Sequence, residues 1–276
     1  MSMKSSSFGD LSGKTALITG GGTGIGLMIA RAFVSNGART IIVGRRIEKL
    51  ESAKKTLDEE AGNGGSAEIM CGDVSTRSGI EKIVSDFESG EQRVLDILVC
   101  NAGIYRSEEK SWNKSLSPEE LSNQFLSSRT EDWIETLTVN TVSPYHLSGA
   151  FIPHLSRSSG PNIIVTSSIA GVHWSANSSN PSYSASKSAM NHLVKIMANR
   201  LAPIYIRVNA IAPGLFPSEM TEDSPWIKQA ITTVPAKRMG NDQEMGFTAL
   251  YLANCGYING QVLVVDGGRS LMASGQ

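Results

Sequence analysis

The sequence predicts one α/β domain with a parallel, doubly wound sheet covered by helices on both faces. Short apolar runs alternate with helical stretches along the chain, and these runs lack the polar alternation of half-exposed strands. Parallel neighbours need right-handed helical crossovers, which place helices on both faces of the sheet. A length of 276 residues would also suit two small domains, but no Pro-, Gly- or Ser-rich linker divides the chain.

The expected elements follow this alternation in order. The strands are runs rich in β-branched residues, such as Thr15-Ala-Leu-Ile18 and Asn162-Ile-Ile-Val-Thr166. The first helix repeats apolar residues at helical spacing from Ile25 to Phe33. We expect strands at 15–18, 40–43, 68–70, 95–99, 162–166, 206–211 and 262–265, and helices at 25–36, 47–60, 79–87 and 183–201. Ligands of such a sheet bind in the crevice at the carboxyl ends of its strands.

One segment between the fourth and fifth strands breaks the pattern. Residues 104–132 are long and polar, and a helix start at Ser117, Pro118 and Glu120 predicts a short helix over 118–126. A long polar connection is most often a solvated surface excursion. Because this one follows a strand end at the ligand crevice, it also fits a wall of a substrate cleft.

The composition predicts a cytoplasmic protein with small-molecule ligands. A net charge of −1 gives no electrostatic basis for a nucleic-acid or membrane-surface partner. Cys71, Cys100 and Cys255 are sparse and far apart, as expected of reduced thiols, and we expect no metal. No apolar run reaches the roughly 18 residues of a membrane span. The Ser-rich residues 1–10 predict a flexible tail rather than a signal peptide, and the domain is expected over 11–270.

A glycine-rich turn joins the first strand to the first helix. In Thr19-Gly-Gly-Gly-Thr-Gly-Ile-Gly26 the glycine spacing differs from the GxGxxG of dinucleotide folds, but the strand–turn–helix context is the same. Glycines let the backbone approach a pyrophosphate, whose charge then meets the helix N-terminus. The turn therefore predicts a dinucleotide site.

A second motif lies far downstream, where Tyr183 and Lys187 stand four residues apart on one face of an expected helix. An unperturbed tyrosine titrates near pH ~10 and is a sluggish acid at neutral pH. A nearby cation favours tyrosinate and moves the tyrosine pKa towards the working range. Taken alone the pair is weak support for a site, because amphipathic helices contain many such pairs.

These motifs gain meaning in combination. The chain also contains Asn101-Ala-Gly103, Asn140, Ser168 and Pro213-Gly214, in the order in which short-chain dehydrogenase/reductases carry theirs. From about Leu11 to Gly268 the sequence resembles that family, which implies a Rossmann-like fold and a nicotinamide cofactor. Cys100 stands where the family usually has asparagine, a mild departure because the Asn-Ala-Gly turn after it is intact.

The resemblance implies a cofactor cleft across the sheet. Asp73 matches the carboxylate that holds the adenine amino group, and main-chain groups near Phe216 would meet the nicotinamide carboxamide. The cofactor-binding residues so implied are Gly20, Gly22, Thr23, Gly24, Ile25, Gly26, Arg45, Arg46, Asp73, Val74, Asn101, Ala102, Gly103, Tyr183, Lys187, Pro213, Gly214 and Phe216.

Two arginines at the end of the second strand predict which cofactor is bound. Dinucleotide folds that bind NAD commonly place an acid here for the ribose 2′-hydroxyl, whereas arginine accommodates a 2′-phosphate. This chain has Arg45 and Arg46 and no acid, and a guanidinium suits phosphate because it donates two parallel charged hydrogen bonds. The alternative is that Arg46 merely begins a solvated helix face. We expect NADP(H).

The resemblance also implies a catalytic set of Asn140, Ser168, Tyr183 and Lys187. Tyr183 would donate a proton, Lys187 would tune it and reach the nicotinamide ribose, and Ser168 would bond the substrate oxygen. Asn140 would help hold a water that links Lys187 to solvent, or would be a buried asparagine that satisfies helix backbone. Ser167 is a weaker candidate than Ser168, because strand alternation turns it the other way.

Residues 215–240 would form a mobile substrate lid, as in relatives, and its Met220, Trp226 and Ile227 either line an apolar pocket or simply pack. The phrase around Pro213 is most similar to bacterial-type 3-oxoacyl reductases, including rhamnolipid-linked ones. Relatives are usually tetramers or dimers. Because the helix at 183–201 has an apolar face, we expect a homotetramer or homodimer. The residues of that face are Ala189, Leu193, Ile196 and Met197.

The expected function is NADPH-dependent reduction of a ketone to a secondary alcohol, with a 3-oxoacyl or secondary-metabolite carbonyl as candidate substrate. One alternative is the NADP-dependent oxidation of a secondary alcohol, polyol or steroid. Another is a non-catalytic NADP(H)-binding regulator, because a fold does not fix a function. The intact catalytic set argues against the regulator.

Overall fold

The computed structural model describes residues 8–90, 94–106, 116–173, 180–221 and 226–272. Within these ranges the strands form one parallel sheet in the order β3-β2-β1-β4-β5-β6-β7. The strands are β1 Thr15–Thr19, β2 Arg39–Gly44, β3 Ser66–Cys71, β4 Ile97–Cys100, β5 Asn162–Thr166, β6 Arg207–Pro213 and β7 Val262–Val265. Strand order reverses between β1 and β4, so the ligand crevice opens at their carboxyl ends. The predicted fold class is confirmed.

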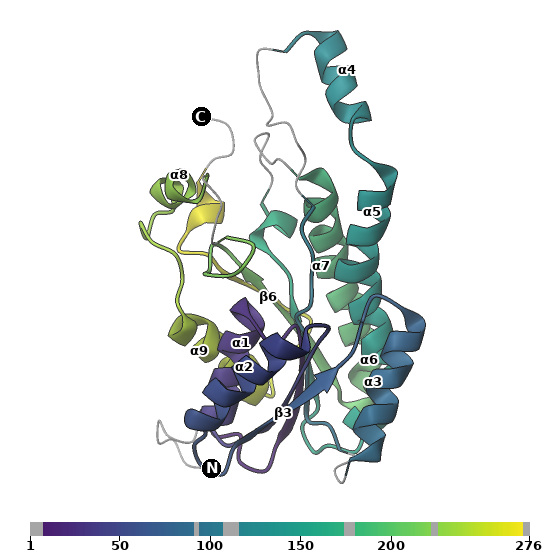
Figure 1. Cartoon of the computed structure of the whole chain (residues 1–276), viewed down its shortest axis with the longest axis vertical. Coiled ribbons are helices and arrows are strands. Elements are labelled where there is room, and N and C mark those ends of the chain that lie inside the picture. The colour runs from purple at the N-terminus through teal and green to yellow at the C-terminus, as the bar shows by residue number, and fades with distance from the viewer. Residues whose placement is uncertain (1–7, 91–93, 107–115, 174–179, 222–225, 273–276) are drawn as a thin grey trace.

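Helices cover both faces of the sheet (Figure 1). Phe33, Leu50 and Met245 belong to the core between the sheet and α1, α2 and α9, whereas Phe87, Phe151 and Val194 belong to the core under α3, α6 and α7. The helices are α1 Gly24–Ser35, α2 Ile47–Glu59, α3 Arg77–Ser89, α4 Pro118–Leu126, α5 Thr130–Leu137, α6 Ser143–Leu155, α7 Pro181–Leu201, α8 Trp226–Thr233 and α9 Asp242–Asn254. Of the described helices, none is long and apolar enough to cross a bilayer.

All the expected strands and helices are present, with ends displaced by a few residues. The expectations did not include α5, α6, α8 or α9. A sequence signal for α9 was available, because Asn241 and Glu244 form the same kind of capping box that predicted α4. The predicted tail falls largely on residues 1–7, which lie outside the described ranges, while Leu11 is already buried.

The helix predicted over 118–126 matches α4 in full. The Ser117 hydroxyl accepts from the Glu120 amide at 3.2 Å, and the Glu120 carboxylate accepts from the Ser117 amide at 2.7 Å. None of the residues of α4 is buried, and the helix projects from the body of the protein (Figure 1). The surface-excursion alternative therefore describes α4 itself.

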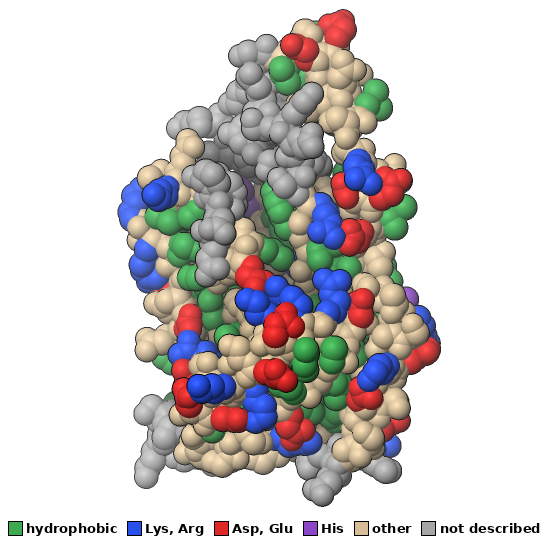
Figure 2. All heavy atoms as spheres, viewed as in Figure 1, with side chains coloured by type: hydrophobic (Ala, Val, Ile, Leu, Met, Phe, Trp, Pro, Cys, Tyr) green, Lys and Arg blue, Asp and Glu red, His purple; other side chains and the backbone are tan. Residues whose placement is uncertain are grey.

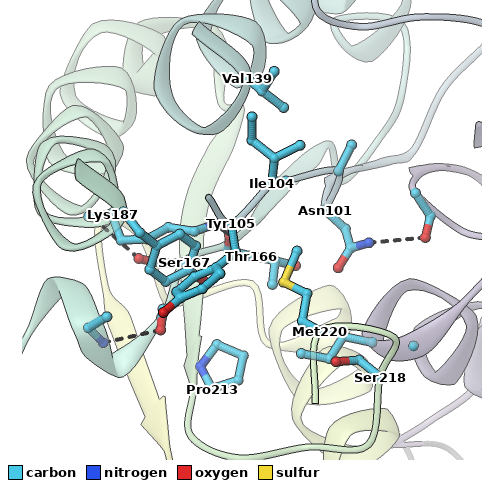
Figure 3. Close-up of a pocket in the computed structure, with 18 of the residues that line it drawn as sticks. Asn101, Ile104, Tyr105, Val139, Thr166, Ser167, Lys187, Pro213, Ser218 and Met220 are labelled. Carbon is cyan, nitrogen blue, oxygen red and sulfur yellow. Dashed lines mark hydrogen bonds between the residues drawn. The ribbon is translucent and has the colours of Figure 1, made fainter. Parts of the chain in front are cut away.

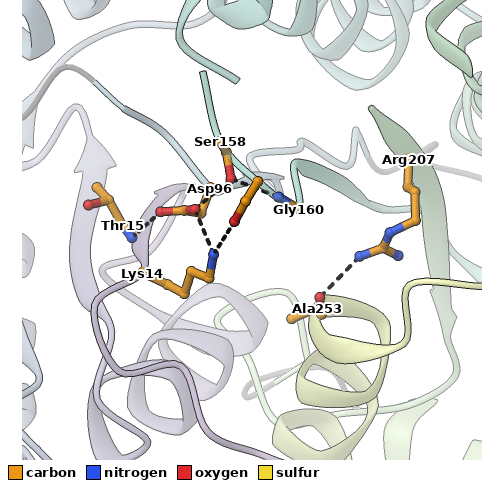
Figure 4. Close-up of polar contacts among 8 residues, drawn as sticks. Lys14, Thr15, Asp96, Ser158, Gly160, Arg207 and Ala253 are labelled. Atoms are coloured by element: carbon orange, nitrogen blue, oxygen red, sulfur yellow. Dashed lines mark hydrogen bonds and ion pairs between the residues drawn. The ribbon is translucent and has the colours of Figure 1, made fainter. Parts of the chain in front are cut away.

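A buried carboxylate fixes the edge of the sheet opposite the ligand crevice (Figure 4). Asp96, only 5% exposed, accepts from the Thr15 amide at 2.9 Å, from Lys14 Nζ at 3.1 Å and from the Ser158 hydroxyl. At the same edge Arg207 donates to carbonyls at the end of α9, including Ala253 at 3.0 Å. Because a buried charge needs several partners, these contacts hold the amino ends of the strands together.

Candidate active site

A cleft of about 2420 Å³ opens at the carboxyl edge of the sheet. Of the residues predicted for the site, only Gly26 and Asn140 do not line it. Figure 3 shows Pro213, Ser218 and Met220 across the cleft from Ile104 and Val139. The fold therefore gathers at one edge motifs that lie nearly 200 positions apart in the sequence.

The glycine turn is shaped by close backbone approach. Gly20 and Gly24 have positive φ angles of 65° and 51°, which side chains rarely adopt. A Cβ on Gly26 would lie 2.2 Å from the Gly20 carbonyl oxygen, so only glycine lets α1 pack this tightly on the turn. Gly26 thus acts behind the cleft and does not line it.

The N-terminus of α1 has free hydrogen-bond donors facing the turn. Its N-cap residue Thr23 makes no side-chain cap bond, and the first turn contains no acid. By contrast, α4 and α9 both have complete capping boxes. Uncapped N–H groups and the positive end of the helix dipole suit a phosphate group. The turn thus fits the pyrophosphate of a dinucleotide.

Asn101 is hydrogen-bonded to this turn through Thr19. Thr19 was not among the predicted site residues. Asn101 Nδ2 donates to the carbonyls of Thr19 at 3.0 Å and Gly20 at 3.2 Å. The Thr19 hydroxyl accepts from the amides of Asn101 and Ala102 at 3.0 and 3.2 Å. A polar residue that ends a wholly buried strand was the available signal. The Asn101 amide braces the two turns that border the crevice (Figure 3).

The structure separates the two arginines predicted for a 2′-phosphate. Arg45 lies exposed on the cleft wall, and its guanidinium makes no ion pair with any described residue. Arg46 donates two hydrogen bonds to Glu219, at 2.7 and 3.2 Å, so it does not simply begin a solvated helix face. This bond lowers the pKa of Glu219 and raises that of Arg46. Asp73 also lines the cleft, where its carboxylate accepts from the Ser75 amide.

Ser168 and Tyr183 meet across the cleft floor. Their hydroxyls form a hydrogen bond that lowers the pKa of Tyr183, but desolvation by burial raises that pKa by more. A nearby cation was expected to lower the pKa of Tyr183, and the net direction is the opposite. Ser167 also lines the cleft, but its hydroxyl donates to Asn191 of α7 at 2.6 Å and is not bonded to Tyr183.

Lys187 is buried beneath Tyr183. Its side chain is 4% exposed, and its Nζ lies 5.6 Å from the centre of the Tyr183 ring. Nζ donates to the Thr166 carbonyl at the end of β5 at 2.8 Å. Burial lowers the pKa of Lys187 to about 8. The ammonium therefore remains charged at neutral pH while being held by the end of a strand (Figure 3).

Asn140 lies in a turn of π-helix, Thr138–Val142, between α5 and α6. Such turns are frequent at functional sites. Its side chain accepts from the Ile104 amide at 2.8 Å and donates to the Ile104 carbonyl at 3.0 Å and the Ser186 hydroxyl at 3.1 Å. In this arrangement the side chain satisfies the backbone of the loop at Ile104, and not helix backbone as the second alternative had it. A Cβ on Gly103 would lie 3.2 Å from Asn140 Oδ1 and 3.6 Å from Lys187 Nζ, so all three groups are close together.

The loop held by Asn140 supplies a wall for the reacting end of the cleft. The Tyr105 ring meets the Tyr183 ring edge to face, with centroids 5.4 Å apart. Ile104, Phe125 and Ile134 also line the cleft. The cleft-wall alternative therefore applies to Ile104 and Tyr105 at the start of the polar segment and to Phe125 of the otherwise exposed α4, and residues 107–115 lie outside the described ranges.

The segment predicted as a lid is anchored at both ends. Phe216 is buried against Gly240, where a Cβ would lie 2.3 Å from the phenyl ring, and the Gly240 amide donates to the Leu215 carbonyl at 2.9 Å. The segment contains helix α8 and is not irregular throughout. Met220 lines the cleft and Ile227 does not, while the side chain of Trp226 lies outside the described part.

Residues 14–226 match the family model described as short chain dehydrogenase. The chain belongs to the short-chain dehydrogenase/reductase family. It is 35% identical over 273 residues to the short-chain dehydrogenase/reductase PhomF of Diaporthe leptostromiformis, covering 93% of this chain and 91% of the relative. It is 33% identical over 270 residues to the 3-oxoacyl-[acyl-carrier-protein] reductase FabG of Chlamydia trachomatis, covering 95% and 99%.

Solved structures of family members resemble the whole chain. An NADP complex of RhlG from Pseudomonas aeruginosa has a TM-score of 0.84 at 29% identity, covering 96% of this chain and 99% of that one. A gluconate 5-dehydrogenase from Burkholderia cenocepacia, in complex with NADP and tartrate, has a TM-score of 0.82 at 28% identity, covering 98% and 100%. A short-chain oxidoreductase acting on CH–OH or C=O groups fits the cleft described above.

The buried charge of Lys187 predicts a measurable cost in stability. Its pKa of about 8, against an ordinary 10.5, implies that burying the charged form costs on the order of 3 kcal/mol at neutral pH. Lys187→Met removes this cost but also loses the hydrogen bond to Thr166. The net effect should be a free energy of unfolding about 1–3 kcal/mol higher at pH 7. Between about pH 8 and 10.5 the unfolded chain holds more protons than the native one. The wild type then gains stability as the pH rises, and the advantage of the variant should fade.

Urea denaturation at several pH values tests this. Lys195→Met, at an exposed position of the same helix, is the control and should change stability by less than about 0.5 kcal/mol throughout. A Lys187→Met protein less stable than the wild type at pH 7 would contradict the assigned cost.

Proposed function

We propose that this protein reduces a ketone to a secondary alcohol with NADPH. The observation that carries the proposal is the Ser168–Tyr183 hydroxyl pair above a buried Lys187, in the cleft that also contains the uncapped N-terminus of α1. A nicotinamide cofactor, when bound, supplies the hydride. The protein supplies the position of the carbonyl and the proton for its oxygen.

Each proposed role follows from a contact in the cleft. Ser168 donates to the substrate oxygen and polarises it, and Tyr183 transfers its proton to that oxygen. Burial raises the pKa of Tyr183, so its hydroxyl holds at neutral pH the proton that reduction requires. Lys187, charged below about pH 8, stabilises the tyrosinate that remains. Asn140 positions the loop at Ile104, and by the family resemblance it would help hold a water near Lys187.

The preference for NADP(H) rests on Arg45. Its guanidinium lies on the cleft wall after the end of β2, with no ion-pair partner among the described residues, where an acid would favour NAD. Two similar structures contain NADP, which supports the assignment by analogy. The glycine turn, Asp73 and Val74, Asn101 to Gly103, and Pro213 to Phe216 would bind the rest of the cofactor.

The substrate is proposed to be a 3-oxoacyl or secondary-metabolite carbonyl compound. Ile104, Phe125, Ile134 and Met220 give the reacting end of the cleft an apolar wall, and one relative is a 3-oxoacyl reductase. Oxidation of a secondary alcohol remains the second candidate, because the same residues serve both directions. We further propose that residues 215–240 act as a lid and that the protein is cytoplasmic, in keeping with three cysteines that form no disulfide.

We predict a homo-oligomer, more readily a tetramer than a dimer. The apolar face assigned to α7 is smaller than the sequence suggested, because Met197 is only 3% exposed and belongs to the core. Ala189, Leu193 and Ile196 remain partly exposed, and Val142 and Tyr145 add apolar surface at the start of α6. Light scattering at micromolar concentration should give a multiple of 29.5 kDa. A mass equal to one chain would refute this.

Tyr183→Phe should retain NADPH binding and lose turnover by about 10²-fold or more, the usual contribution of general acid catalysis. Fluorescence titration gives the first quantity, and steady-state kinetics on a ketone panel give the second. Tyr145→Phe, which removes a hydroxyl from an exposed tyrosine of α6, is the control and should behave as the wild type. Near-normal rates for Tyr183→Phe on a good substrate would show that another group donates the proton.

Arg45→Asp should reverse the cofactor preference. One charge-assisted hydrogen bond contributes about 1.5–3 kcal/mol, so the wild type should favour NADPH over NADH by roughly 10- to 100-fold in kcat/KM. The aspartate removes that attraction and adds repulsion, and the reversal should weaken at high salt. Arg77→Asp, an equal charge change at an exposed site outside the cleft, is the control. Equal efficiency of the native protein with both cofactors would contradict the role of Arg45.

A further inference from the structure

An ion-pair cluster joins the segment after β6 to the start of α2. Arg46 donates to Glu219 at 2.7 and 3.2 Å, and Lys49 lies 3.4 Å from the same carboxylate. We call Glu219, Arg46 and Lys49 the Glu219 clasp. It joins residues 173 positions apart in the sequence. All three residues line the cleft, so the clasp is part of the cleft wall at its adenosine end.

The clasp is presented by a preformed turn, Ser218–Thr221. The Ser218 amide donates to the Thr221 hydroxyl at 2.8 Å, and that hydroxyl donates to the Phe216 carbonyl at 3.0 Å. Ser218 lies against the glycine turn, where a Cβ on Gly24 would be 3.0 Å from Ser218 Cβ. The neighbouring Met220 lines the cleft (Figure 3). One turn therefore contacts the glycine turn, the clasp partners and the apolar wall.

The clasp uses the guanidinium that a 2′-phosphate would use. The adenosine ribose of a dinucleotide lies at the end of β2, beside Arg45 and Arg46. Arg46 gives the parallel donors at its Nη1/Nη2 end to Glu219, so a phosphate that approaches this end of the guanidinium competes with the carboxylate. A phosphate placed there would also face the negative charge of Glu219. Among the described residues, Glu48 at the start of α2 is a further acid that interacts electrostatically with Arg46.

We propose that Glu219 is a specificity-determining residue that competes with the 2′-phosphate of the cofactor for Arg46. This rests on the proposed NADP(H)-dependent function. Binding of a 2′-phosphate displaces the Glu219 carboxylate and frees the Ser218–Thr221 turn from α2. A cofactor without that phosphate leaves the clasp closed. The turn that includes Met220 is therefore released only by the phosphorylated cofactor, which couples cofactor choice to the wall of the substrate cleft.

Adenosine 2′,5′-bisphosphate and adenosine 5′-monophosphate test the competition without involving the reaction, because they differ only in the 2′-phosphate. Isothermal titration of the full-length protein gives both dissociation constants for the wild type and for Glu219→Gln. The variant should bind the bisphosphate about three- to fivefold more tightly, the upper range for an exposed ion pair, and the monophosphate with an unchanged constant. The difference should shrink as salt rises. Glu51→Gln, at an exposed position of α2 outside the clasp, is the charge-matched control and should change neither constant.

Two further measurements test whether Glu219 acts through Arg46 and whether the 2′-phosphate releases the turn. In an Arg46→Gln background, Glu219→Gln should no longer tighten bisphosphate binding, because no guanidinium is left to compete for. In the wild type, the bisphosphate should lower the hydrogen-exchange protection of residues 216–221, and the monophosphate should not. Equal or weaker bisphosphate binding by Glu219→Gln would overturn the competition and show a clasp that holds the cofactor in place. A wild type that binds both nucleotides equally would instead refute the proposed NADP(H) preference, so the two failures are distinguishable.

Discussion

The burial of the Lys187 ammonium is the constraint on which the arrangement around Tyr183 and Ser168 depends. An ammonium with 4% exposure needs a partner, and it finds the Thr166 carbonyl at the carboxyl end of β5. That contact sets the distance between α7 and the sheet, and so fixes where Tyr183 meets Ser168. A Cβ on Gly103 would lie 3.2 Å from Asn140 Oδ1, so a larger residue here would require Asn140 to move slightly. The geometry of the Ser168–Tyr183 pair thus depends on the solvation of one charge.

The other end of the cleft is governed by unpaired positive charge. The N-terminus of α1 has neither a side-chain cap nor an acid in its first turn, and Arg45 has no ion-pair partner among the described residues. Such a region favours an anion, and the anion that fits a strand–turn–helix crevice is a dinucleotide phosphate. The Glu219 clasp partly neutralises this region from the opposite wall. The carboxylate of Glu219 therefore faces the positive charges of this region. On the face shown in Figure 2, basic and acidic side chains are otherwise interspersed.

Much of the fold and of the cleft could be predicted from short stretches of the sequence. The seven strands, the glycine turn and the Tyr183–Lys187 pair are each encoded within a few neighbouring residues, so periodicity and motif spacing suffice to find them. The capping box at Ser117 fixed the bounds of α4 for the same reason. Helices α5 and α6 were not predicted. A π-helical turn joins them, and such a shift in backbone hydrogen bonding leaves no pattern in the side chains.

The sequence by itself was enough to predict the fold class, the family and most of the residues that line the cleft, because these depend on residue type and order. Only the tertiary structure decided what several of those residues do. It showed that the Asn101 and Asn140 side chains bond to backbone, and that Arg46 is paired with Glu219 while Arg45 has no ion-pair partner among the described residues. It also showed that burial raises the pKa of Tyr183, where a lowered pKa was expected. The physical reason is that solvation and ion pairing depend on groups distant in sequence. The partner of Arg46 lies 173 positions away, and no local pattern contains it.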